Sequence, residues 1–392
     1  MDRQTGGGVD PNTGLFVQGD PQNGQPGSYP SAAWANGLTE EVRNAIVDAG
    51  LAPAEGDWTQ LRQAIAIIAA RNGGTPNLAI NGSFAVWQRG TTIGLAAGQG
   101  ERYTADRWAT RSDSSLGAGF LQVAHQAPGT AGNPPPGMRH ELRLTQQTAA
   151  TAAQPYLAHR IEDVGLTASR TITVSWWMRQ ETAGWPVDVQ VRQNFGAGGS
   201  ASVSLPLQST VAVPGTTDWK RHSLTFEVPA VGSASVGAGD HLEIALLFPQ
   251  GALFTVHLAQ FRVEFGDTAT PFEYLPIELE TLACRRYFQC SYEPGVAPGS
   301  VASRGAQQAF ESYFRGNSLQ TRFPIPMRGT PTVVWYSPVT GAGNRVYSNE
   351  SNTNEVVTAT EEASSVATGF PVFATALPFT NLEAHWTADA EL

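Results

Sequence analysis

The residues best suited to chemistry lie on two consecutive stretches, 171–180 and 187–195, in which polar and apolar residues alternate. The polar face of the first stretch carries Trp177 beside Arg179, and that of the second carries Asp188, Gln190 and Arg192. Carbohydrate binding needs flat aromatic rings for the sugar rings, and guanidinium, carboxylate and amide groups for the hydroxyls. If the two strands are neighbours in one sheet, these side chains form a single patch for a sugar chain.

Trp185 lies in the turn Gly184-Trp185-Pro186 between the two stretches and is placed to rim such a patch. A competing interpretation is that a loop covers Trp177, or that this face packs on a neighbouring subunit, because large exposed aromatic side chains mark interfaces of several kinds. The candidate carbohydrate-binding residues are Trp177, Arg179, Trp185, Asp188, Gln190 and Arg192.

Catalysis is the alternative use of the polar residues. Hydrolysis of a glycan needs two carboxylates held across a cleft, one of them with a raised pKa. The sequence contains no zinc-binding histidine spacing, no GxSxG motif and no phosphate-binding loop. The sequence therefore identifies no catalytic residue and favours a protein that is not an enzyme. The carboxylates considered are Asp106, Glu141, Glu162, Asp188 and Glu243.

Composition bounds the fold and the partners. The chain has 392 residues, of which 15% are charged, with 41 Gly and 26 Pro, values typical of a turn-rich, mainly β protein. The net charge is -10 and the arginines are scattered, which argues against a nucleic-acid partner. No apolar run is long enough to enter a membrane as a spanning segment.

Residues 1–30 are dense in Gly, Pro, Asn and Gln and cannot fold alone. They are interpreted either as a disordered tail or as an extended arm that becomes ordered on a partner. The apolar island at 15–17 favours the arm. Its expected anchoring residues are Leu15, Phe16, Val17 and Tyr29.

Residues 31–74 predict two short amphipathic helices that form a hairpin, with Trp34 at the start of the first apolar stripe and as a further anchor. Gly50 ends the first helix, and Asp57 caps the second. The apolar stripes are expected to pack between copies of the chain. Docking on the β-domain that follows is the alternative.

The pattern changes to period two from residue 75. An apolar strand interrupted by the Asn81-Gly82 turn opens this region, which contains at least eight strands up to residue 275 and therefore predicts an antiparallel sandwich of the jelly-roll type. A connector at 276–290 leads to a smaller β-domain at 291–392. The tryptophans expected in or beside the core are Trp87, Trp108, Trp176 and Trp219.

Four runs carry a family resemblance: NLAINGSFAVWQRGT, YTADRW, AQFRVEFGDTATPFEYLPIELETLACRRYF and HWTADAEL. With these runs the chain resembles virion fibre and spike proteins of tailed phages, which have a carbohydrate-binding-module-like jelly roll and a small C-terminal β-domain. WANGLTEEVRNAIVDAGL and DWTQLRQAI resemble the helical part near the N-termini of phage tail fibres. The arginine-rich, lysine-poor composition also resembles the gene transfer agents of alphaproteobacteria, whose capsids carry head spikes.

This resemblance implies a non-enzymatic virion component, assembled in a bacterial cytoplasm, that attaches the particle to host surface polysaccharide (capsule). Residues 1–74 would dock on other virion proteins, in a trimer or pentamer. The alternatives are a purely architectural connector and a glycan depolymerase. No cofactor is expected, although such jelly rolls often hold a structural calcium, for which Asn81, Asp106 and Glu264 could supply oxygen atoms; the metal stays unassigned.

Overall fold

The computed structural model describes much of the chain, in two compact units, Met1–Thr75 and Pro76–Leu392. The described residues are 20–23, 27, 32–71, 76–95, 100–111, 120–127, 129, 132–149, 153–181, 185–210, 218–309, 318–356, 369–373 and 381–392. No helix within those ranges has the length and apolarity needed to cross a membrane.

The first unit contains the predicted helical hairpin. After a short turn, η1 (Pro21–Asn23), come α1 (Ala32–Asp48) and α2 (Gln60–Arg71). The two helices pack through a small apolar core, which confirms the hairpin. Its buried members are Ile46, Ala49, Ala64 and Ile67.

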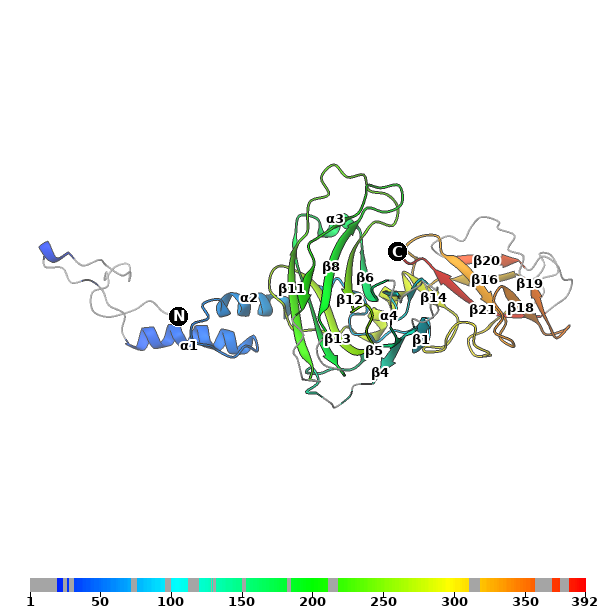
Figure 1. Cartoon of the computed structure of the whole chain (residues 1–392), viewed down its shortest axis with the longest axis horizontal. Coiled ribbons are helices and arrows are strands. Elements are labelled where there is room, and N and C mark those ends of the chain that lie inside the picture. The colour runs from blue at the N-terminus through cyan, green and yellow to red at the C-terminus, as the bar shows by residue number, and fades with distance from the viewer. Residues whose placement is uncertain are drawn as a thin grey trace. The chain divides into compact units, whose positions relative to one another are not determined.

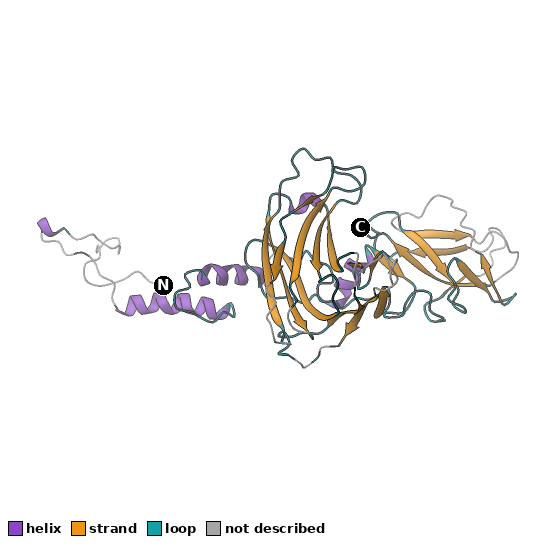
Figure 2. Ribbon diagram, viewed as in Figure 1, coloured by secondary structure: helices purple, strands orange, loops and turns teal. Residues whose placement is uncertain are grey.

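The second unit begins with a mainly β sandwich of two antiparallel sheets (Figures 1 and 2). One sheet has six strands in the order β1-β4-β5-β13-β7-β11. Its strands are β1 (Thr92–Leu95), β4 (Phe120–Gln126), β5 (Glu141–Thr148), β7 (Thr171–Gln180), β11 (Lys220–Glu227) and β13 (Phe254–Phe265).

The other sheet has seven strands in the order β10-β8-β12-β6-β3-β2, with β9 paired to β8. A short helix, α3 (Val164–Thr167), follows β6. The strands are β2 (Glu101–Tyr103), β3 (Trp108–Arg111), β6 (Tyr156–Glu162), β8 (Val187–Asn194), β9 (Val203–Ser204), β10 (Gln208–Thr210) and β12 (His241–Leu247).

The sandwich core lies between these sheets, and the alternation in the sequence predicts which residues enter it. In β7, Ile172, Val174, Trp176 and Met178 all belong to the core cluster. Each strand buries one face in this way because successive side chains point to opposite sides of a sheet. The predicted antiparallel sandwich is therefore confirmed.

The stretch from Asn77 to Trp87 is not the opening strand that the sequence predicts. It forms turns and extended backbone, and β1 starts only at Thr92. The left-handed conformations of Asn81 (φ 58°) and Phe84 (φ 56°) break the strand geometry.

The Asn81 side chain then stabilises this fold of the backbone. It accepts a hydrogen bond from the Val86 amide and donates to the carbonyls of Val86 and Asp106. We call residues 77–87 the plug. Its tryptophan, Trp87, belongs to the core cluster, as do Trp108 and Trp176.

A helix, α4 (Ile277–Arg285), connects the sandwich to a smaller β-region centred on one strand, β21 (Leu382–Asp389). The partners of β21 are β14 (Phe288–Cys290), β15 (Gln307–Ala309), β17 (Thr332–Tyr336) and β18 (Arg345–Ser348), and β18 also pairs β19 (Thr353–Val356). A separate pair joins β16 (Ser318–Arg322) to β20 (Gly369–Phe373). Residues 310–317, whose sequence also predicts a strand, lie outside the described residues.

His159 is a fully buried histidine on β6, and it makes the sandwich sensitive to acid. Its ring packs edge-on against Trp108, and its Nε2 lies 3.0 Å from the carbonyl oxygen of Ile80. Burial, with a contribution from the nearby Arg107 charge, lowers the pKa of His159 to about 3. The folded protein therefore holds this histidine neutral at pH values where the unfolded chain protonates it.

We expect this histidine to destabilise the wild-type protein progressively as the pH falls below 6.5, by roughly 1.4 kcal/mol per pH unit. The folded pKa is depressed, so the stabilisation is complete above the unfolded pKa and is lost as the pH falls toward the folded one. His159→Gln removes this titration. Urea unfolding of both proteins between pH 7 and 4.5 should show their stability difference changing by about 2–3 kcal/mol in favour of the variant. A constant difference would contradict the assignment.

Candidate functional site

The six predicted carbohydrate-binding residues do not form one patch. β7 belongs to the six-stranded sheet and β8 to the seven-stranded sheet, so the condition that these strands are neighbours is not met. Their polar faces point away from the sandwich on opposite sides. Trp177 and Arg179 are thereby separated from Asp188, Gln190 and Arg192, and Trp185 lies on the connection between the sheets with 39% of its surface exposed.

The outer face of the six-stranded sheet is largely covered around Trp177. Arg221, directly opposite Trp177 on β11, donates to the carbonyl of Thr270. Glu264 accepts hydrogen bonds from the amide and the hydroxyl of Thr270, at 2.9 and 2.6 Å, and is fully buried. The loop that contains Thr270 therefore lies over this face, as the competing interpretation of Trp177 supposed, and Trp177 itself is half-buried.

Arg179 lies in a polar cluster on the same face. Its Nη2 is 3.0 Å from Nε2 of His257, and the Nδ1 of His257 is 2.9 Å from Glu141. Trp219 is buried, and its ring lies 5.9 Å from the guanidinium carbon of Arg179. We expected Trp219 in or beside the core; it is buried but is not a member of the core cluster of the sandwich. Nε2 of His257 also lies 2.9 Å from Glu181, so these polar side chains contact one another within the protein.

The outer face of the seven-stranded sheet presents a row of ion pairs, which we call the charge ladder: Glu101, Arg160, Glu243 and Arg192. Arg160 contacts Glu101 at 2.7 Å and Glu243 at 3.0 Å, and Arg192 contacts the other oxygen of Glu243 at 2.6 Å. The ladder crosses the sheet from β2 to β8. Because each carboxylate bonds two partners or more, the positions of these side chains are fixed before any ligand arrives.

Next to the charge ladder runs a row of small residues, in which Ala109, Ala158 and Ala245 lie side by side and Gln190 continues the row on β8. Alanine side chains end at Cβ, so the longer side chains of the adjoining rows stand above this row. On the side of the alanine row away from the charge ladder, the next row of side chains includes Tyr156.

Two tyrosines lie on this face: Tyr103, opposite Ala109 and bonded to Arg160, and Tyr156. The hydroxyl of Tyr156 donates to the Glu101 carboxylate, and the guanidinium of Arg111 lies over the Tyr156 ring, 4.9 Å from the centroid. Burial, followed by the bond to Glu101, raises the pKa of Tyr156 well above its ordinary value, so the hydroxyl stays protonated and keeps donating. The row of side chains that contains Tyr156 continues with Leu247 on β12 and Asp188 on β8.

This face combines a flat aromatic ring, half-buried amide and carboxylate groups, and fixed guanidinium groups on regular strands. It is the arrangement that suits an extended sugar chain. Three of the predicted residues, Asp188, Gln190 and Arg192, lie on it. The residues that the sequence did not single out for binding are Glu101, Arg111, Tyr156, Arg160 and Glu243, whose common face is visible only once the strand order is known.

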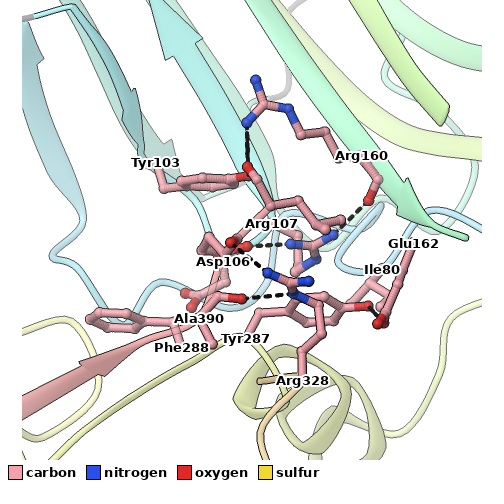
Figure 3. Close-up of polar contacts among 12 residues, drawn as sticks. Ile80, Tyr103, Asp106, Arg107, Arg160, Glu162, Tyr287, Phe288, Arg328 and Ala390 are labelled. Atoms are coloured by element: carbon pink, nitrogen blue, oxygen red, sulfur yellow. Dashed lines mark hydrogen bonds and ion pairs between the residues drawn. The ribbon is translucent and has the colours of Figure 1, made fainter. Parts of the chain in front are cut away.

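A second polar cluster is buried where the sandwich meets the end of β21 (Figure 3). The guanidinium groups of Arg89 and Arg107 lie on the rings of Phe288 and Tyr287, at 3.6 and 3.5 Å, and both contact the carboxylate of Glu391. We call these five residues the arginine clamp. Burial acts to lower the pKa of Arg107, but the attraction of Glu391, together with the contributions of Tyr287 and Tyr103, outweighs it and the pKa is raised.

The arginine clamp is built from the runs that carry the family resemblance. Arg89 and Arg107 come from the first two runs, Tyr287 and Phe288 from the third and Glu391 from the last. These residues bond one another, and Arg107 is only 1% exposed in its side chain. The recognisable part of the sequence therefore builds a structural joint, and through Tyr103 and Leu392 it also contacts Arg160 of the charge ladder.

Asp106 lies beside the clamp and is fully buried. It accepts hydrogen bonds from the amide and the side chain of Gln88, at 2.7 and 2.8 Å, and lies 3.6 Å from Arg89. Burial raises the pKa of Asp106 to about 6, against the opposing effect of Arg89.

The three residues considered for calcium do not converge. Asn81 bonds backbone groups of Val86 and Asp106, whereas Glu264 bonds Thr270 on the outer face of the six-stranded sheet. Among the described residues, no group of three or more His, Cys, Asp or Glu side chains is arranged to hold a metal ion.

The carboxylates considered for catalysis are likewise engaged by the protein. Glu162 accepts bonds from Arg286 and Tyr287, and Glu141 bonds His257. Glu243 is held by two arginines in the charge ladder. None of these contacts forms an open pair of carboxylates across a cleft.

No family model matches the sequence, and no curated protein matches it. Solved structures with partial likeness include TmCBM61 in complex with β-1,4-galactotriose (11% identity, 49% of this chain and 100% of that chain, TM-score 0.29). A Stig cyclase from Fischerella (14% identity, 50% and 98%, TM-score 0.32) is also similar. So is the enzymatically active domain of tailspike protein 4 of bacteriophage CBA120 (12% identity, 41% and 19%, TM-score 0.27). Because each TM-score is below 0.5, these likenesses carry no argument about what this chain binds or catalyses.

Proposed function

We propose that this chain is a non-enzymatic component of a virion spike or fibre that attaches the particle to host cell-surface polysaccharide. The sugar chain binds on the outer face of the seven-stranded sheet, across Tyr156, Gln190, Asp188 and Arg192. The observation that carries this proposal is the charge ladder beside the alanine row, which positions polar and aromatic groups on the outer face of the sheet.

The virion assignment is supported by the sequence runs that resemble phage fibre and spike proteins. In this proposal the protein is assembled in a bacterial cytoplasm and works as part of the particle. Residues 1–74 dock on other virion proteins and hold several copies together as a trimer or pentamer. The proposed anchors Leu15, Phe16, Val17 and Tyr29 lie outside the described residues, and Trp34 lies on α1.

Exposed apolar side chains on the helical unit support self-association. Trp58 is 95% exposed and Ile65 60%, whereas the core between α1 and α2 is formed by other residues. Exposed apolar surface of this kind marks contact with a partner. Several copies in one particle would multiply weak sugar contacts into firm attachment.

Replacing Asp188 and Gln190 together by alanine should weaken binding to an immobilised surface polysaccharide about 10- to 100-fold, the loss expected for two hydrogen-bonding side chains. Biolayer interferometry of the full chain measures the affinity, and circular dichroism checks that the fold is retained. Both residues are half-buried, so we expect little change in stability.

Trp177→Ala, on the opposite sheet, is the matched control and should leave the affinity unchanged. If this variant and not the double variant loses binding, the site lies on the six-stranded sheet. If no variant binds any polysaccharide, the architectural alternative replaces this proposal. Trp58→Ser should lower the mass in solution and the avidity, while the affinity of one copy for a soluble oligosaccharide stays the same.

A further inference from the structure

Arg111, at the end of β3, is the guanidinium group on the proposed glycan face that has no ion-pair partner among the described residues. From this we propose that the bound polysaccharide is acidic, and that Arg111 binds a carboxylate on one of its sugar units. The inference rests on the proposed glycan-binding function and adds the chemical class of the ligand.

The carboxylate directly opposite Arg111 in the sheet is bonded to other residues. Glu101 lies directly opposite Arg111 in the β2–β3 pair, on the same face of the sheet. Its carboxylate contacts Arg160 at 2.7 Å and accepts the hydroxyl of Tyr156. The charge ladder thus uses Glu101, and no carboxylate among the described residues pairs with Arg111.

The Arg111 guanidinium is oriented, although no described carboxylate pairs with it. Its guanidinium lies over the ring of Tyr156, and its Nε is buried without a hydrogen-bond partner in the described structure. A guanidinium that stacks on an aromatic ring presents its remaining N–H groups in a fixed plane. That geometry fits the two oxygens of a carboxylate, and the preorganised fork loses little freedom on binding.

The position of Arg111 also indicates the length of the ligand. Arg111 is on β3 and Asp188 on β8, and the strands between them are β6 and β12. Three strand spacings place the two residues about 14 Å apart across the face. A ligand that reaches both is an oligosaccharide, with its acidic unit at the Arg111 end and neutral units over Gln190 and Asp188.

The chain as a whole does not attract anions, since its net charge is -10. Acidic glycans would therefore be selected by contact at Arg111 and not by a general positive field. We expect the affinity to fall only modestly between low and physiological salt, as for a single charge contact in a partly enclosed site.

The test uses oligogalacturonate, oligomannuronate and hyaluronan oligosaccharides, each beside its carboxyl-reduced form, in which the carboxylate becomes a hydroxymethyl group on the same sugar backbone. Calorimetry with the full-length protein should show at least one acidic oligosaccharide bound about tenfold or more tightly than its reduced form. Arg111→Gln should abolish that difference and leave the affinity for the reduced form unchanged. Arg111→Lys keeps the charge without the planar fork, so this variant should retain only part of the affinity difference between the acidic and the reduced oligosaccharide.

Arg102→Gln is the matched control. Arg102 is the next residue on β2 after Glu101, so its side chain leaves the opposite side of the strand, and removing the same charge there should not alter the preference. Equal affinities for acidic and reduced oligosaccharides, or an equal loss in Arg111→Gln and Arg102→Gln, would overturn the inference while leaving glycan binding intact. Failure of every acidic and neutral oligosaccharide to bind would overturn the proposed function as well.

Discussion

Replacing Glu391 with glutamine should lower the free energy of unfolding by about 3–5 kcal/mol, the cost of removing one partner from a buried ion pair. Glu391 has a side chain only 4% exposed, and it contacts Arg107 and Arg89, whose side chains are 1% and 11% exposed. Glutamine keeps the shape and removes the charge, so Arg107 stays buried without an anion. Chemical unfolding followed by tryptophan fluorescence measures the loss.

Asp389→Asn provides the matched control for the arginine clamp. Asp389 also contacts Arg89, at 3.2 Å, but its side chain is 43% exposed. An exposed pair of this kind contributes about 0–1 kcal/mol. If the two variants lose equal stability, burial is not what gives the clamp its strength.

The loss in Glu391→Gln should be concentrated in the joint between sandwich and smaller sheet. Ala390 donates its amide to the carbonyl of Tyr287, and Arg328 donates to the carbonyls of Ala390 and Glu391. Hydrogen exchange should therefore rise first at β14 and the end of β21. Combining Glu391→Gln with Arg107→Met, which removes the unpaired charge, should recover part of the lost stability.

Gly82→Ala should destabilise the sandwich by about 2–4 kcal/mol, because overpacking adds to the loss of hydrogen bonds. A Cβ at Gly82 would lie 2.1 Å from the carbonyl oxygen of Phe261 and 2.8 Å from the Asn77 side chain. The Phe261 amide donates to the carbonyl of Gly82 at 2.9 Å, so the two backbones cannot separate without breaking this bond. Thermal unfolding of the variant measures the effect.

Gly329→Ala is the control, since a Cβ at Gly329 would meet nothing within 4 Å. It should change the stability by less than about 0.5 kcal/mol, as for an ordinary surface substitution. A Gly82→Ala protein as stable as Gly329→Ala would show that the plug can move away from β13 without cost.

The sandwich could be predicted from the sequence because alternation reports directly on which side chains are buried. In β7 the pattern assigned Ile172, Val174 and Trp176 to the core correctly. Alternation does not report which strands pair. β7 is bonded to β11 and β13, which come later in the chain, and not to β8, which follows it directly. The predicted patch failed for this reason.

The candidate face was predictable only in part. Asp188, Gln190 and Arg192 stand out because they alternate with valines along one strand. Tyr156, Arg111 and the charge ladder come from strands that are distant in sequence, and only the sheet order joins them. The stretch at 77–87 was wrongly predicted as a strand. Its apolar residues are typical of a strand, but Asn81 and Phe84 adopt positive φ angles, which sequence periodicity does not reveal.

The arginine clamp also has a consequence for folding during synthesis, because its charged residues are far apart in the sequence. Arg107 and Glu391 are 284 residues apart, and Arg89 and Glu391 are 302 apart. At a synthesis rate of roughly 5–20 residues per second, both arginines leave the ribosome about 15–60 seconds before the carboxylate that neutralises them. During that interval the burial of either guanidinium against Glu391 is impossible. The ion pairs of Arg107 and Arg89 with Glu391 can therefore form only after the intervening strands have been synthesised.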